Sequence, residues 1–125
     1  MLSAVNAANA ASTARRARLR ADRVDPRSLR PSDLAVSSRT PLHPGRFLQT
    51  RFLTPLGITQ TELALALGIS RRRVNELIRG RRTITPDTAL RLGLFFRNDP
   101  MFWMTLQSAW DIHAARRALR SLPSR

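Results

Sequence analysis

Two helix patterns separated by only about three residues occupy the segment TQTELALALGISRRRVNELIRG, residues 59–80. The first pattern begins at Thr59, which forms a capping-box arrangement with the glutamate three residues later, and it ends at Gly68. The second begins at Ser70, a favoured N-cap residue, and ends at Gly80. A glycine-containing turn this short between two helices predicts a helix-turn-helix.

Three further helices are predicted from the same kind of signal. The segment HPGRFLQTRFLTPLG begins a helix near Pro44 and is expected to end it before Pro55. Thr85 and Asp99 each precede a proline, which at the first helical position loses only an amide that would be unpaired anyway. No segment alternates with the period of a strand, so the sequence predicts an all-α domain of five helices.

The beginning of the chain has a different composition. Residues 1–38 contain seven arginines and almost no large apolar side chains, so they bury too little surface to offset the entropy of ordering. We therefore expect a disordered Arg/Ala-rich extension over residues 1–40 and the helical domain over residues 41–120. A short helix around Ala10 to Arg23 fits the propensities, but nothing in the sequence indicates where it would dock. Two alternatives remain: an upstream start codon outside the native protein, or a nonspecific phosphate-binding arm.

The charge balance indicates a polyanionic partner. All 22 basic residues are arginine, and only eight acids oppose them, which gives a net charge of +14. Nucleic acid is therefore the first expectation. No apolar run approaches the ~20 residues that span a bilayer, and no secretory signal begins the chain, so we expect a cytoplasmic protein with no membrane partner.

Catalytic and metal chemistry are not expected. The chain has no cysteine, which excludes a disulfide, a thiolate zinc site and a cysteine nucleophile. His43 and His113 have no neighbouring group of carboxylates that predicts a metal site or a catalytic triad. We expect no enzyme activity, no metal and no cofactor.

The second helix of the helix-turn-helix carries the residues expected to read DNA. At 100° per residue, Val74, Leu77 and Ile78 share one sector and should face the core. The opposite side carries Arg72, Asn75, Glu76 and Arg79, with Arg71 and Arg73 on its flanks. The arginine fork matches two acceptors of guanine or a phosphate, and asparagine matches adenine. Arg72 points most directly away from the core and is the first candidate for base readout; the alternative is solvated surface charge.

The last helix has two apolar stripes. Phe102, Trp103, Leu106 and Trp110 form the first stripe, which is expected to pack on the domain itself. A partial second stripe predicts a dimerisation surface, and its residues are Met101, Thr105, Ile112, Ala115 and Leu119. Dimeric helix-turn-helix proteins present two recognition helices to DNA about 34 Å apart, so a homodimer is expected.

At this point the residues resemble a known family. The segment TQTELALALGISRRRVNELIRGRRTITPDTALRLGLFF resembles the XRE-type, Cro/C1-like (lambda-repressor-like) domain, and residues 41–117 are similar to its HigA antitoxin group. The HPG, PLGITQ, GRRTITPDTALRL and FWMTLQSAWD segments carry the likeness in order. Two features depart from the pattern: Arg46 replaces a common acid, and the first 40 residues have no expected counterpart.

The resemblance implies which residues contact DNA. It places Gln60 on a phosphate, the stretch from Arg71 to Asn75 at the groove, and three later arginines beside the backbone. Free amides at a helix N-terminus independently favour an anion at Thr59 and Gln60. The full expected set is Thr59, Gln60, Ser70, Arg71, Arg72, Arg73, Asn75, Arg79, Arg81 and Arg82.

The resemblance further implies a sequence-specific transcriptional repressor that is the antitoxin of a HigBA-type pair. Such a protein binds double-stranded operator DNA at its own promoter and neutralises a HigB-type toxin, a small RelE-like ribonuclease. A stand-alone XRE-family regulator without a toxin is the alternative. A third hypothesis is nonspecific nucleic-acid coating dominated by the arginine-rich tail.

Overall fold

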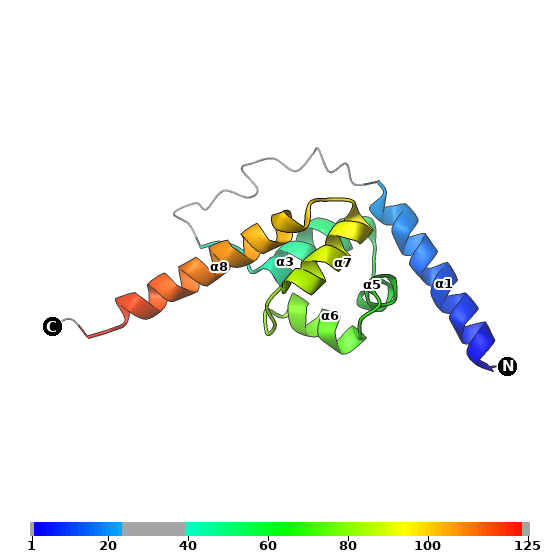
Figure 1. Ribbon diagram of the computed structural model, residues 1–125, viewed down its shortest axis with the longest axis horizontal. Coiled ribbons are helices and arrows are strands. Elements are labelled where there is room, and N and C mark those ends of the chain that lie inside the picture. The colour runs from blue at the N-terminus through cyan, green and yellow to red at the C-terminus, as the bar shows by residue number, and fades with distance from the viewer. Residues whose placement is uncertain (1, 24–39, 124–125) are drawn as a thin grey trace.

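The computed structural model describes residues 2–23 and 40–123, and their regular structure is entirely helical (Figure 1). The five predicted helices are present, and one further helix precedes them. The first predicted helix is divided into three segments. The elements are α1 (Leu2–Ala21), α3 (Pro44–Leu48), η2 (Gln49–Leu53), α4 (Thr54–Leu56), α5 (Gln60–Leu67), α6 (Arg71–Ile78), α7 (Pro86–Phe96) and α8 (Pro100–Arg120). Within the described residues, no helix is both long and apolar enough to cross a membrane.

The capping residues act as the sequence predicts. Thr59 and Glu62 form the complete capping box of α5, and the side chain of Ser70 accepts a hydrogen bond from the backbone N–H of Arg73. Thr85 and Asp99 cap α7 and α8 in the same way. Each cap satisfies an amide that the first helical turn leaves without an intrahelical partner. The ends of the helices therefore follow from local sequence.

The prediction that the first helix ends before Pro55 is corrected by the structure. The helix continues through Pro55 to Leu56 and ends at Gly57, which has a left-handed conformation with φ of 66°. In a regular α-helix, a proline ring clashes with the carbonyl four residues earlier. The π-helical turn Gln49–Leu53 widens the helix just before Pro55, which gives the ring room without breaking the helix.

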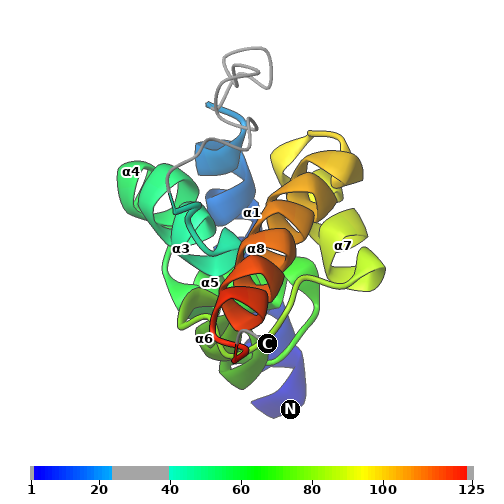
Figure 2. The ribbon, with the colours of Figure 1, turned by 90° about the vertical axis from the view of Figure 1, so that its left-hand side faces the viewer.

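Aromatic side chains from three helical segments form the centre of the core. The ring of Phe52 lies 4.6 Å from that of Phe96 and 5.2 Å from that of Trp103. Trp103 has no exposed surface, and its indole Nε1–H donates to Asn98 over 3.0 Å. Burial of an aromatic side chain of this kind contributes about 1.5–3 kcal/mol. Figure 2 shows α8, which carries Trp103, between α3 and α7.

A close approach of two backbones fixes α3 against the end of α6. A Cβ atom at Gly45 would lie only 1.6 Å from the carbonyl oxygen of Leu77, so no other residue fits there. His43 caps α3, because its Nδ1 accepts a hydrogen bond from the Gly45 N–H over 3.0 Å. Burial lowers the pKa of His43, although the nearby carboxylate of Asp111 acts in the opposite direction. The lowered pKa favours the neutral imidazole, which is the form that can accept this bond.

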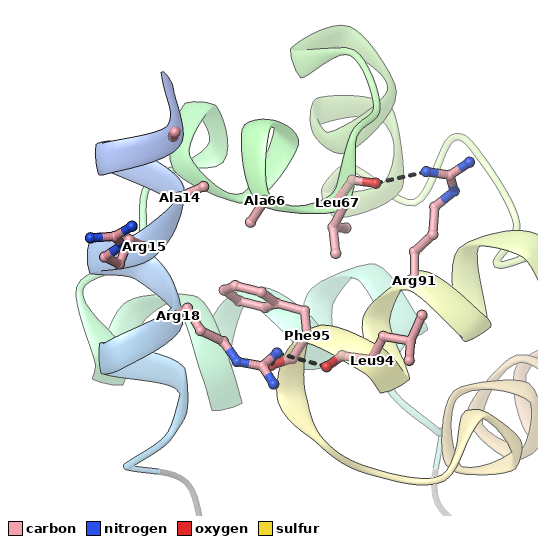
Figure 3. Close-up of a pocket in the computed structure, with 9 residues that line it drawn as sticks. Ala14, Arg15, Arg18, Ala66, Leu67, Arg91, Leu94 and Phe95 are labelled. Atoms are coloured by element: carbon pink, nitrogen blue, oxygen red, sulfur yellow. Dashed lines mark hydrogen bonds between the residues drawn. The ribbon is translucent and has the colours of Figure 1, made fainter. Parts of the chain in front are cut away.

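The structure differs from the expected disorder in the first part of the extension. Residues Leu2–Ala21 form α1, which packs against α5 and α7 (Figures 1 and 3). Ala17 and Ala21 are buried there, because their small side chains allow the helices to approach closely. Residues 24–39 of the expected extension lie outside the described residues.

Arginines hold α1 in place. The guanidinium of Arg18 donates to the carbonyls of Leu94 and Phe95 at the end of α7, where the helix leaves carbonyls without intrahelical partners (Figure 3). Arg20 forms an ion pair with Glu62 of the α5 capping box. Burial alone would raise the pKa of Glu62, but hydrogen bonds from Thr59 and Arg20 lower it overall. Two of the arginines in the predicted disordered extension, Arg18 and Arg20, therefore bind α1 to α7 and α5.

Replacement of Ala17 by aspartate should release α1 from the body. Ala17 has no exposed surface, and burial of an unpaired carboxylate there costs more than about 1–3 kcal/mol. Hydrogen exchange should show loss of amide protection across α1, while α5 to α8 keep theirs. Ser12→Asp places the same charge on an exposed position of α1 and should leave protection unchanged. Retained protection of α1 in Ala17→Asp would contradict the docking described above.

Candidate nucleic-acid interface

The turn between α5 and α6 sets the direction of α6. Gly68 adopts the left-handed conformation with φ of 71°, which ends α5 and turns the chain sharply. Val74 and Leu77 of α6 are buried, and Ile78 is partly buried, as the sequence predicts. The body of the protein lies on that side of α6, so the opposite side faces outward (Figure 1).

The outward side of α6 carries two exposed arginines at its N-terminal end. Arg71 and Arg72 are exposed, and the Arg72 side chain keeps 89% of its accessible surface. Nε of Arg72 donates to Glu76 over 3.0 Å, and Arg82 donates to the other oxygen of the same carboxylate over 2.7 Å. Hydrogen bonds from Arg82 and then from Arg72 hold the pKa of Glu76 below its usual value. Glu76 thus aligns two arginines along one surface.

Arg73 is placed differently from its two neighbours. Its side chain is only 27% exposed, and its guanidinium donates to Thr88 over 2.8 Å and to Asp87 over 3.3 Å. Arg91 and then Arg73 donate hydrogen bonds that hold the pKa of Asp87 below its usual value. The structure therefore uses Arg73 to connect the start of α6 with the start of α7. The sequence reasoning missed Asp87 and Thr88 as its partners, because a helix wheel gives no information about the neighbouring helix.

Gln60 and Asn75 meet at the junction of α5 and α6. The side-chain amide of Asn75 donates to the side-chain oxygen of Gln60 over 3.0 Å. Gln60 is the first residue of α5, so this contact lies where helix amides and the helix dipole favour an anion. Thr59 lies beside it and is exposed.

The remaining candidate DNA-binding residues lie at the two ends of α6. Ser70 is exposed at the start of α6, and Arg79, Arg81 and Arg82 are exposed at and beyond its end. Among the described residues, Arg82 is the only one of these three arginines that forms an ion pair. Apart from the partly buried Arg73, the structure thus brings all expected DNA-binding residues to α6, its two ends and the start of α5.

The candidate dimerisation residues lie on α8. Met101, Ile112 and Leu119 are exposed by 61%, 47% and 67%, and the C-terminal half of α8 extends beyond the body (Figure 1). Ala115 is exposed and Thr105 is partly buried. The first stripe of α8 packs inward as expected, with three residues buried and Trp110 partly buried beside His43.

The chain is similar in sequence to known proteins. A family model described as helix-turn-helix matches residues 51–100. Virulence-associated protein I of Dichelobacter nodosus is 41% identical over 81 residues, which cover 65% of this chain and 75% of that protein. Antitoxin HigA-1 of Vibrio cholerae is 38% identical over 80 residues, which cover 64% and 75% of the two chains. An HTH-type transcriptional regulator of Haemophilus influenzae is 32% identical over 90 residues, which cover 70% and 84%.

A solved structure extends this likeness to the fold. The antitoxin HigA of Pseudomonas aeruginosa, determined with the higBA promoter, is 41% identical with a TM-score of 0.61. The match covers 62% of this chain and 85% of that one. This likeness confirms the predicted all-α, Cro/C1-like fold, and the relatives are transcriptional regulators and antitoxins, a non-enzymatic kind of protein. The chain belongs to the HigA-type antitoxin group of the XRE (Cro/C1-like) helix-turn-helix family.

Proposed function

We propose that this chain is a sequence-specific transcriptional repressor that inserts α6 into the major groove of operator DNA. The observation that carries the proposal is the orientation of α6, whose buried Val74 and Leu77 leave Arg71 and Arg72 pointing outward. The net charge of +14 favours a polyanionic partner. The related HigA antitoxin determined with its promoter supports DNA as that partner.

Arg71 and Arg72 are the residues we assign to base edges. The N-terminal end of a recognition helix offers its side chains to the major groove, and the arginine fork matches O6 and N7 of guanine. The contact between Arg72 and Glu76 opens at little cost, because solvent screens such an exposed pair. Arg73 instead positions the helix through α7. Asn75 reads adenine if its contact with Gln60 opens when DNA binds.

Phosphate contacts flank this reading surface. We assign them to the residues at the start of α5, at the start of α6 and beyond its end, where exposed cations and helix amides face outward. These residues are Thr59, Gln60, Ser70, Arg79, Arg81 and Arg82.

The second apolar face of α8 is the proposed homodimer interface. At 100° per residue, its five residues fall within a sector of about 80°, so they form one stripe along the helix. The residues are Met101, Thr105, Ile112, Ala115 and Leu119. Most of this stripe is exposed in the single chain. Pairing through it would bring two copies of α6 onto one pseudo-palindromic operator.

We further propose that the protein is the antitoxin of a HigBA-type pair, which represses its own operon and neutralises a RelE-like ribonuclease toxin in the cytoplasm. The identity with relatives named antitoxin HigA supports this assignment. A stand-alone regulator is the second candidate, and the Haemophilus relative named as a transcriptional regulator favours it.

Replacement of Arg72 by alanine should relax base preference at one position of the operator. Loss of a bidentate contact to guanine costs ~1–3 kcal/mol on the cognate sequence and little on a scrambled one. Fluorescence anisotropy with both DNAs at several salt concentrations measures this difference. Arg116→Ala removes the same charge from an exposed position of α8 and should change neither preference.

Arg73→Ala separates positioning from readout. It should weaken binding to the operator and lower the melting temperature of the free protein, because the link between α6 and α7 is lost.

An equal loss of affinity on all DNA sequences in Arg72→Ala would show that Arg72 contacts a phosphate and does not read a base. Wild-type protein that binds its upstream DNA no better than scrambled DNA would contradict the repressor proposal.

Ile112→Asp should shift the protein towards monomer and weaken operator binding by at least tenfold, because an unpaired charge in a buried interface costs more than about 1.4 kcal/mol. Sedimentation velocity measures the oligomeric state. Ala114→Asp adds the same charge on the other side of α8 and should leave the dimer intact. A monomeric wild type, or equal effects of both variants, would contradict the proposed interface.

Co-expression with the neighbouring gene tests the antitoxin proposal. A short basic open reading frame beside this gene should arrest growth when expressed alone, and this protein should restore growth and co-purify with the product. A neighbouring gene without toxicity, or toxicity that this protein does not relieve, would favour the stand-alone regulator.

A further inference from the structure

A groove of about 600 Å³ lies at the C-terminal end of α6, where the start of α3 and the middle of α8 meet it. Arg46 of α3 lines this groove together with Arg79 and Arg81. His43 and Trp110 form part of its wall, with their rings edge to face at 5.1 Å. Nothing in the sequence analysis assigned Arg46 to a site.

The fold itself brings the three arginines together. Because Gly45 packs on the carbonyl of Leu77, the first turn of α3 is held against the last turn of α6. Arg46 therefore lies beside the same groove as Arg79 and Arg81, although more than 30 positions separate it from them in the sequence.

These three arginines differ from Arg72, Arg73 and Arg82 in their charge partners. Glu76 binds Arg72 and Arg82, and Asp87 binds Arg73 and Arg91. Within residues 2–23 and 40–123, no carboxylate forms an ion pair with the arginines of the groove, and all three are exposed. Asp111, whose charge acts on His43 in the wall of the groove, accepts a hydrogen bond from Gln107.

Like charges around one recess repel each other, and an anion held between them removes that cost. A phosphate group fits this arrangement, because each planar guanidinium can donate two parallel hydrogen bonds to its oxygens. The dipole at the C-terminal end of α6 would by itself explain one nearby cation. It does not explain three, one from α3 and two from the segment that follows α6.

We propose that Arg46, Arg79 and Arg81 together bind one backbone phosphate of DNA in the groove at the C-terminal end of α6. The inference rests on the proposed DNA-binding function, because the groove adjoins the end of the helix that we place in the major groove. Arg46 would then anchor the protein on the DNA backbone without reading sequence. It extends the DNA contact surface from the helix-turn-helix to the first turn of α3.

Arg46→Ala tests this site. Its affinity should fall by the same factor, roughly 3- to 10-fold, on operator and on scrambled DNA. The slope of log K against log salt should become shallower by at most about 0.9, the value for one whole phosphate contact, because Arg79 and Arg81 still hold the same phosphate. Arg46→Lys should recover part of the loss, and Arg116→Ala, an exposed arginine outside the groove, should show neither change.

Operator DNA with a single uncharged methylphosphonate, moved along the backbone, locates the phosphate. Wild-type protein should lose affinity at one position where Arg46→Ala loses less, because the Arg46 contact is already absent there and only Arg79 and Arg81 remain to be lost. If the DNA affinity and salt slope of Arg46→Ala equal those of wild type and of Arg116→Ala, the proposal is overturned. A lower melting temperature of Arg46→Ala with unchanged DNA affinity would also overturn it.

Free phosphate is the competing source of the same chemistry. Trp110 lies in the groove, so its fluorescence should report titration with inorganic phosphate. Saturable binding that Arg46→Ala abolishes while DNA affinity stays unchanged would overturn the DNA assignment. The test remains distinct from that of the repressor proposal, because a protein without operator preference still shows the effect of Arg46 on nonspecific DNA.

Discussion

Burial of Val74 and Leu77 is the interaction on which the rest of the interface depends. Each side chain contributes about 1.5–3 kcal/mol when it leaves water, and both lie on one side of a two-turn helix. A helix held in this way has no freedom to rotate, so its other side must face outward. Gly45 fixes the far end of the same helix through backbone contact with Leu77. The direction of the arginines is therefore a consequence of apolar packing rather than of their charge.

The few acids divide the arginines into three groups. Glu62, Asp87 and two carbonyls of α7 bind arginines that hold helices together, including Arg18 and Arg73. Glu76 holds Arg72 and Arg82 loosely at the surface, where water screens the ion pairs. Arginines without a carboxylate partner in the described part of the chain gather at the groove beyond α6 and on the surface. An excess of base over acid thus leaves a definite set of cations available for a polyanion.

Local signals predicted most of the helical domain, and tertiary contacts account for what they missed. Caps and glycines located α5 and α6, because these residues satisfy helix ends through neighbours in sequence. The docking of α1 was missed because alanine is small, and a search for large apolar residues does not detect a close helix contact through Ala17. The inward position of Arg73 depends on Asp87 of another helix. A helix wheel predicts which side of a helix a residue occupies but not which other helix it contacts. The position of Arg46 beside the end of α6 therefore became visible only in the structure.

Amide chemical shifts of ¹⁵N-labelled protein titrated with operator DNA test the central claim most directly. If apolar packing holds the arginine side of α6 outward for DNA, the largest shifts should fall on Arg71, Arg72 and Gln60, with Gly80 also affected. The amides of Val74 and Leu77 should keep their slow hydrogen exchange, since their side of α6 remains packed. Shifts concentrated on α1 or on the free end of α8, with α6 unperturbed, would contradict the account.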